Sequence, residues 1–158
     1  MSESLRPRRS PEGEAFTELV LEVAWLGGLF TAAGEALAKV GNQTLARWVI
    51  LDRIEDAPAT VAQIARERHI ARQAVQRVAD LLEREGLARY EPNPDHRRAK
   101  LLHPTARGRE ALRAISIQQK AWADAMGAEI GAAKLRSTAK TIEQVRRAVL
   151  SRGLPGGE

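Results

Sequence analysis

Residues 60–108 read TVAQIARERHIARQAVQRVADLLEREGLARYEPNPDHRRAKLLHPTARG, and this stretch decides the fold. Its first residues, Thr60-Val61-Ala62-Gln63, form a capping box, in which the threonine oxygen accepts a backbone N–H and the glutamine reaches back to the cap. The pattern predicts a short helix to about Arg68 and, after a break at residues 69–71, a second helix over about 72–85. Gly86 is expected to end this second helix as a left-handed C-cap.

A short β-hairpin is predicted directly after the second helix. Residues 87–91 alternate well enough for a strand, which Pro92 stops, and residues 100–103 can form its return partner. Pro104 should keep the returning strand short. Two short helices followed by a hairpin with a cationic tip, residues 93–98, describe a winged helix-turn-helix. The major groove of DNA admits one helix, a preceding helix braces it, and a hairpin can reach the adjacent minor groove.

The exposed polar face of the second helix is the candidate DNA-reading surface. Glutamine can pair with an adenine edge, and arginine can pair with guanine or with phosphate. Residues 59–108 carry ten basic and six acidic side chains, whereas the whole chain has a net charge of +5, so positive charge is concentrated here. An ordinary solvated face is the alternative. The candidate DNA contacts on the two helices and the wing are Thr60, Arg72, Gln73, Ala74, Gln76, Arg77, Arg98 and Lys100.

The same stretch resembles the MarR family of dimeric bacterial transcriptional regulators. The resemblance rests on the helix ending in LLEREGL, on the triplet Asp95-His96-Arg97, and on the later Thr105-Ala106-Arg107-Gly108, at their expected separations. It implies that Arg97 enters the minor groove of DNA and that Asp95 pairs with this arginine and orients it. One departure is Ala71, which stands where the family usually has a serine cap. A missing cap costs about 1 kcal/mol, and we expect the free amides there to meet a phosphate.

Helices with apolar stripes are predicted on both sides of this unit. Ser10-Pro11 begins one that ends at Gly41, Asn42 or Thr44 caps the next, and Thr105 caps a later one that Gly131 interrupts. The fold class is therefore mainly α with a small β-hairpin wing (α+β). The predicted parts are a disordered basic arm (1–10), an N-terminal dimerisation helix (11–41), the winged helix-turn-helix DNA-binding domain (42–104), C-terminal dimerisation helices (105–152) and a disordered tail (153–158).

The outer helices carry more apolar surface than so small a DNA-reading unit can cover. A homodimer is the expected cover, and an extended monomeric helical bundle is the alternative. A twofold dimer places its recognition helices about 34 Å apart and implies a pseudo-palindromic operator. The candidate dimerisation residues are Phe16, Val20, Val23, Ile142, Val145 and Val149.

Three tryptophans suggest a place for an effector. Trp25, Trp48 and Trp122 fall on the first, second and fifth predicted helices, which in the MarR family border a cleft. They could stack on a small aromatic or anionic effector, with Arg47 as its counter-charge, although simple core tryptophans are the alternative. The identity of the effector, the operator sequence and the sign of regulation do not follow from the sequence.

Several function classes are excluded or disfavoured. The chain has no cysteine, which excludes disulfides and thiolate sites, and the spacing of His69, His96 and His103 matches no zinc pattern, so neither a metal nor another cofactor is expected. No nucleophile is paired with a base, which argues against an enzyme. No uninterrupted apolar run approaches the roughly 20 residues of a membrane helix, and the N-terminus does not resemble a secretory signal, so a cytoplasmic location is expected.

The sequence thus predicts a DNA-binding transcriptional regulator. We expect a repressor that binds a pseudo-palindromic operator as a homodimer and is released by a small effector. The alternative is a winged-helix module for protein docking or assembly without specific DNA binding, because this fold does not dictate its partner.

Overall fold

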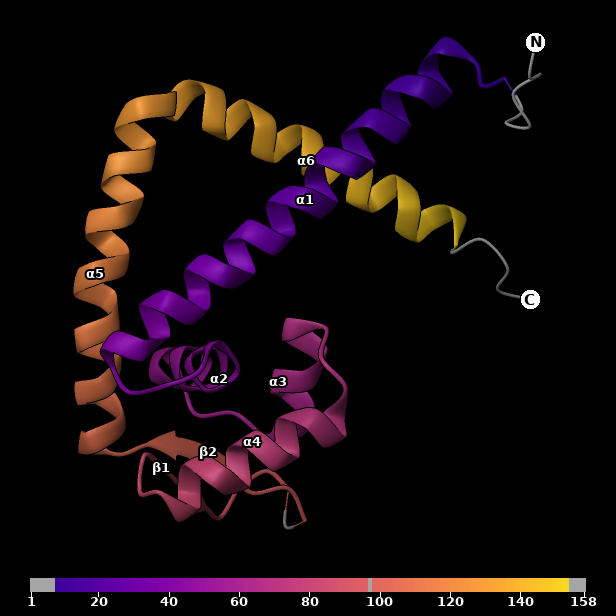
Figure 1. Cartoon of the computed structure of the whole chain (residues 1–158). Helices are drawn as coiled ribbons and strands as arrows, with labels where there is room; N and C mark the ends of the chain where they lie inside the picture. The colour runs from indigo at the N-terminus through magenta and orange to yellow at the C-terminus, as the bar shows by residue number, and fades with distance from the viewer. Residues whose placement is uncertain (1–7, 97, 154–158) are drawn as a thin grey trace, which may run out of the picture. The chain divides into compact units, whose positions relative to one another are not determined.

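The computed structural model describes residues 8–96 and 98–153, and these residues fold into six helices and one β-hairpin. Two compact units, residues 1–115 and 116–158, are described separately below. The elements, drawn in Figure 1, are α1 (Pro11–Val40), α2 (Leu45–Asp56), α3 (Val61–Arg68), α4 (Arg72–Arg84), β1 (Ala88–Glu91), β2 (Leu101–Pro104), α5 (Ala106–Ile130) and α6 (Ala132–Arg152).

The helix ends lie where local chemistry predicted them. The side chain of Ser10 caps α1, and the side chain of Thr44, not that of Asn42, caps α2 by accepting the N–H of Arg47 at 3.4 Å. At α3 both halves of the capping box form. The hydroxyl of Thr60 accepts the N–H of Gln63 at 3.2 Å, and Oε1 of Gln63 accepts the N–H of Thr60 at 2.8 Å. These side chains satisfy amides that have no partner inside their own helix.

A close contact joins the end of α4 to the start of α5. Gly86 has a left-handed φ of 71°, and the following Leu87 N–H donates to the carbonyl of Leu82 at 2.8 Å. The hydroxyl of Thr105 donates to the Gly86 carbonyl at 2.7 Å and accepts the Gly108 N–H at 3.1 Å. A Cβ atom on Gly108 would lie 2.1 Å from the Leu87 carbonyl oxygen. Residues 105–108 therefore serve packing, and only glycine fits at the last of them.

The wing is a two-stranded antiparallel sheet in which Ala88 pairs with Pro104 and Glu91 pairs with Leu101. Pro104 belongs to β2 as its last residue, one position beyond the predicted end of this strand. Ala59, just before α3, forms a further bridge with Leu102, whose N–H donates to the Ala59 carbonyl at 2.9 Å. The wing is thus tied at its base to the segment that leads into α3.

One hydrophobic core holds this arrangement together within the first unit. Helix α2 contacts α1, α4 and β2, and α3 packs on α4. The largest fully buried side chains come from α2, α3, α4, β2 and α5: Ile50, Leu51, Ile54, Ile64, Val75, Leu82, Leu102 and Ile115. Because α4 buries Val75, Ala79 and Leu82 in this core, its opposite face is fixed toward the surface.

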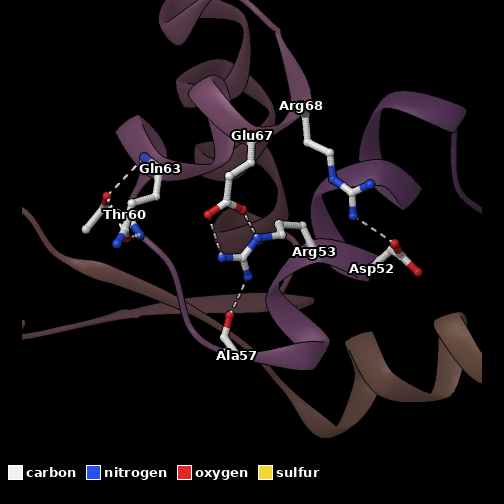
Figure 2. Close-up of polar contacts among 7 residues, drawn as sticks. All are labelled: Asp52, Arg53, Ala57, Thr60, Gln63, Glu67 and Arg68. Carbon is white, nitrogen blue, oxygen red and sulfur yellow. Dashed lines mark hydrogen bonds and ion pairs between the residues drawn. The ribbon is translucent and has the colours of Figure 1, made fainter. Parts of the chain in front are cut away.

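Two ion pairs tie α3 to α2, as Figure 2 shows. The guanidinium of Arg53 binds the carboxylate of Glu67 through both of its oxygens and also donates to the Ala57 carbonyl at 2.9 Å. A second pair joins Arg68 to Asp52 at 3.0 Å. Exposed ion pairs contribute little individually, but a bidentate arginine pair fixes orientation. The two pairs therefore set the orientation of α3, the helix that supports α4.

Helix α1 is the most apolar element of the chain. It is long and apolar enough to cross a membrane by length and composition, with a mean hydropathy of 1.4 over an 18-residue window of which 0% is buried. Glu18 and Glu22 interrupt this stretch, which is why the sequence shows no uninterrupted apolar run. A helix face that binds another protein has the same composition, so this feature alone is weak support for a membrane location.

Candidate nucleic-acid interface

The candidate interface is the outer face of α4. Arg72, Gln73, Gln76 and Arg77 are all exposed there, as predicted, whereas Ala74 is half-buried. The spacing of Val75, Ala79 and Leu82, which point into the core, accounts for this division. The polar face consequently stands on a rigid support, as a helix that enters a DNA groove requires.

The first turn of α4 has no side-chain cap. Ala71 stands at the N-cap position, and no side chain of the described residues bonds to the helix end. The carbonyl of Ala71 accepts the amides of Ala74 and Val75, at 2.9 and 3.1 Å. The preceding amides of the helix, at Arg72 and Gln73, have no acceptor within it. This end can therefore accept an anionic group from outside.

A ring of three polar side chains, which the sequence pattern did not predict, joins α4 to the wing. Nε2 of Gln76 donates to Oδ1 of Asp80 at 2.7 Å and to the Tyr90 hydroxyl at 2.9 Å, and the same hydroxyl lies 3.0 Å from Oδ1 of Asp80. Burial, together with the hydrogen bond to Asp80, raises the pKa of Tyr90. The spacing of Gln76 and Asp80, four residues apart on a helix, was a signal for the contact between them. Tyr90 reaches them only because β1 packs against α4.

The tip of the wing is a turn stabilised by Asn93. Its side-chain oxygen accepts the Asp95 N–H at 3.0 Å, and its carbonyl accepts the His96 N–H at 3.3 Å. Asp95, Arg98 and Lys100 are exposed. Arg97 lies outside the described residues, so its pairing with Asp95 stays a prediction.

Acidic and basic side chains alternate on the outer face of the strands. Glu91 pairs with Arg89 at 2.6 Å and with His103 at 3.2 Å. The hydrogen bond from Arg89 lowers the pKa of Glu91. His103 therefore has a carboxylate partner within the wing.

A cavity of about 390 Å³ lies between α3, α4 and the wing. It brings together predicted DNA contacts from all three parts of the unit, and its lining includes Thr60, Arg72, Gln76, Tyr90, Arg98 and Lys100. Thr60 is only 8% exposed, and its hydroxyl is engaged by Gln63. We therefore assign Thr60 to the helix cap, and the cationic side chains around the cavity remain the groups suited to phosphate.

Comparison with known proteins agrees with this geometry. Residues 44–99 match the MarR family. An uncharacterized protein of Mycobacterium tuberculosis is 36% identical over 132 residues, which are 84% of this chain and 92% of the relative. The chain belongs to the MarR family. Membership confirms the predicted family and the expectation of a DNA-binding transcription regulator rather than an enzyme.

Solved structures share the fold of this MarR-family protein and confirm its predicted fold class. A MarR family transcription regulator superposes with a TM-score of 0.80 at 23% identity, covering 90% of this chain and 97% of that one. Staphylococcus aureus MarR in complex with salicylate and kanamycin gives 0.76 at 19% identity, covering 89% and 95%. Streptococcus pneumoniae FabT in complex with DNA gives 0.69 at 17% identity, covering 87% and 99%.

The four residues predicted for an effector site have different surroundings in this MarR-family protein. Arg47 pairs with Glu85 at 2.6 Å, so its charge is already matched. Trp48 packs against the core, which agrees with the alternative interpretation of a core tryptophan. Trp25, in contrast, is 72% exposed. Trp122 belongs to the second unit. The effector site stays a prediction.

Metal ligands do not cluster in the part of the chain that the structure describes. Among residues 8–96 and 98–153, no group of three or more histidine, aspartate or glutamate side chains could hold a metal ion. His69 has a left-handed φ of 53° at the end of α3, where it helps to form the turn into α4. A positive φ is uncommon for a residue with a side chain, and it marks this histidine as part of a turn.

Proposed function

We propose that this MarR-family regulator is a homodimeric repressor that binds a pseudo-palindromic operator and is released by a small aromatic or anionic effector. The observation that carries the proposal is the juxtaposition, around one cavity, of the exposed face of α4 with cations of the wing. A cytoplasmic location follows from a role at DNA. Repression would result from occlusion of a promoter by the bound dimer.

The proposed DNA contacts divide by groove. Arg72, Gln73, Gln76 and Arg77 on α4 would enter the major groove, where arginine and glutamine read base edges. Arg98 and Lys100 would hold phosphates, and Arg97, oriented by Asp95, would enter the minor groove. The amides of the uncapped first turn of α4 would contribute a further phosphate contact.

The proposed dimer uses the apolar residues of α1 and α6. Phe16 and Val20 are 47% and 45% exposed in the single chain, and Ile142 is 38% exposed. Exposed apolar surface of this extent marks an interface. Residues 11–41 and 105–152 are accordingly proposed as the dimerisation parts and residues 42–104 as the DNA-binding domain. The arm at residues 1–10 and the tail at residues 153–158 include residues outside the described ranges.

The effector part of the proposal rests on two observations. Its support is the salicylate and kanamycin bound in the structure of Staphylococcus aureus MarR and the tryptophans at 25, 48 and 122. Arg47 could serve as the counter-charge of an anion only by releasing Glu85, since the two side chains are 2.6 Å apart. Quenching of tryptophan fluorescence by aromatic acids, with release of DNA, tests this part.

Selection of bound sequences from random duplexes at physiological salt tests DNA binding and dimer geometry together. The expected result is a symmetric site with half-sites about one DNA turn apart. Enrichment of no sequence, or of an asymmetric one, would contradict the proposal. Arg98→Ala should weaken binding to every sequence, whereas Arg113→Ala, on the exposed face of α5, serves as the control.

A salt titration separates DNA binding from the alternative of a protein-docking module. Each phosphate contact lowers the slope of log K against log salt by about 0.9. Several phosphate contacts should therefore give a steep dependence for the wild-type protein, and Arg98→Ala should make the slope about one contact shallower. Weak binding that does not respond to salt would favour the docking module.

A further inference from the structure

The side chain of Gln76 is more constrained than an exposed glutamine usually is. Its Nε2 lies 2.7 Å from Oδ1 of Asp80 on the next turn of α4 and 2.9 Å from the hydroxyl of Tyr90 on β1. A glutamine amide nitrogen carries two hydrogens. Each of the two hydrogens therefore has an acceptor within reach inside the protein.

The carboxylate of Asp80 fixes which end of the Gln76 amide faces inward. An ionised carboxylate only accepts hydrogen bonds, so the Gln76 atom at 2.7 Å from Oδ1 must be the nitrogen. The Tyr90 hydroxyl, at 3.0 Å, donates to the same carboxylate oxygen. The oxygen of the Tyr90 hydroxyl can then accept the second hydrogen of Gln76. The three groups form a closed ring in which each hydrogen has one acceptor.

The ring leaves only the carbonyl oxygen Oε1 of Gln76 to face outward. A free glutamine reads adenine in a bidentate manner, since its amide donates to N7 and accepts from the N6 amino group. We propose that Asp80 and Tyr90 restrict Gln76 to accepting, so that it reads an exocyclic amino group, that of adenine or cytosine on one strand. This inference rests on the proposed function, and it makes Tyr90 and Asp80 positioning residues for Gln76.

Bound DNA should preserve the ring. Asp80 is one of the acidic residues on a surface that would face phosphates, and its carboxylate is hydrogen-bonded by two donors, Gln76 and Tyr90. Turning the Gln76 amide toward a base would leave the carboxylate with one donor fewer beside a polyanion, which is unfavourable. Tyr90 is also half-buried and packs against the core, so its hydroxyl is held in place.

The base preference of the operator tests the proposal. In the selected site, the position read by Gln76 is the one whose preference disappears in Gln76→Ala. At this position the wild-type protein should accept either adenine or cytosine on the same strand, because both bases carry an amino group at their major-groove edge. Selection of A·T alone, or no position that responds to Gln76→Ala, would overturn the proposal. If the wild-type protein enriches no site at all, the proposed function itself has failed.

Base analogues give a sharper test on the selected operator with adenine at this position. Purine lacks the amino group and should weaken wild-type binding by about three- to tenfold, the worth of one hydrogen bond. The 7-deaza analogue of adenine lacks N7 and should change binding by less than about twofold. Sensitivity of the wild-type protein to loss of N7 would contradict an acceptor-only role.

Tyr90→Phe removes one acceptor and frees one hydrogen of Gln76. This variant should narrow the preference to A·T and become sensitive to the 7-deaza analogue by about threefold or more. A purely structural role of the hydroxyl would lower stability without changing the response to the analogue, and that result would overturn the proposal. Asp80→Ala frees the other hydrogen and keeps a good helix former, so it repeats the test if Tyr90→Phe does not fold.

Discussion

The winged helix-turn-helix (residues 42–104) and helix α1 both contain many apolar residues, but they use them differently. Leu51, Ile64 and Leu82 of the winged helix-turn-helix are 0% exposed in a single chain, whereas Phe16 and Phe30 of α1 are 47% and 55% exposed. The winged helix-turn-helix, called the winged unit below, therefore buries its apolar side chains within a single chain. The first twenty residues of α1 do not, and they need a surface that one winged unit does not supply.

Contacts along α1 locate the division between these two uses. Gly34 and Ala38 are its buried residues, and a Cβ atom on Gly34 would lie 2.8 Å from Cδ1 of Leu45 in α2. The C-terminal end of α1 is thus anchored on the winged unit, while its preceding turns present apolar side chains outward. A second copy of the chain would bury them, which is the arrangement proposed above.

The largest expected effect comes from breaking the α1 surface. Phe16→Glu combined with Val20→Glu should raise the dissociation constant of the proposed dimer by about a thousandfold or more, because each buried apolar side chain contributes about 1.5–3 kcal/mol and a twofold interface counts it twice. Sedimentation equilibrium measures this change. The melting transition of the winged unit should persist, and a variant that stays dimeric would place the interface elsewhere.

The next largest effect concerns the close contact between Leu87 of the winged helix-turn-helix and Gly108 at the start of α5. Gly108→Ala would place a methyl group 2.1 Å from the Leu87 carbonyl oxygen, and we expect a loss of about 3 kcal/mol of unfolding free energy. Denaturant unfolding measures the loss. Gly127→Ala on the same helix is the matched control, since a Cβ atom there has no described neighbour within 4 Å; it should be neutral or slightly stabilising. Equal effects of the two changes would refute the packing role of Gly108.

A smaller effect is expected from the cap of α3. Thr60→Ala removes the acceptor of the Gln63 N–H and should lower the unfolding free energy by about 1 kcal/mol. Thr60→Ser keeps the hydroxyl and should recover most of the loss. If Thr60 instead contacted DNA directly, Thr60→Ala would reduce operator affinity without changing the melting temperature.

The smallest effect is expected from the ion pair between α2 and α3, and it depends on pH. The hydrogen bond from Arg53 lowers the pKa of Glu67 below its usual value. The pair therefore adds stability above about pH 5, where an unfolded glutamate with a pKa near 4.3 is ionised, and loses it as the pH falls through the lowered value. The melting temperatures of the wild-type protein and Glu67→Gln should differ slightly at pH 7 and converge in acid. A difference that persists once Glu67 is protonated in the folded protein would point to a cause other than charge.

The sequence predicted the features of the fold that depend on neighbouring residues. Ser10, Thr60 and Gly86 act within one helical turn of their own positions, so their roles were predicted correctly. Contacts that depend on tertiary pairing were missed. Arg47 was predicted as a counter-charge for an effector, but it pairs with Glu85, 38 residues away. Periodicity cannot predict such a partner.

The candidate site shows the same limit. The exposed residues of α4 follow from helical periodicity, and the structure places Arg72, Gln73, Gln76 and Arg77 on one face. What the sequence did not reveal is that the amide nitrogen of Gln76 is hydrogen-bonded to Asp80 and Tyr90. That depends on Tyr90, which reaches α4 only because β1 packs beside it.

The contact at residues 105–108 has a mechanical consequence for the wing. The hairpin begins after Gly86 at the end of α4 and ends at Thr105 before α5. The hydroxyl of Thr105 donates a hydrogen bond to the Gly86 carbonyl at 2.7 Å, and the Thr105 N–H donates to the Leu87 carbonyl at 3.0 Å. Both ends of the hairpin are therefore hydrogen-bonded around the first turn of α5. A shift of that turn would move the two ends of the hairpin together, against the ties that hold the wing to Ala59 and Gln76.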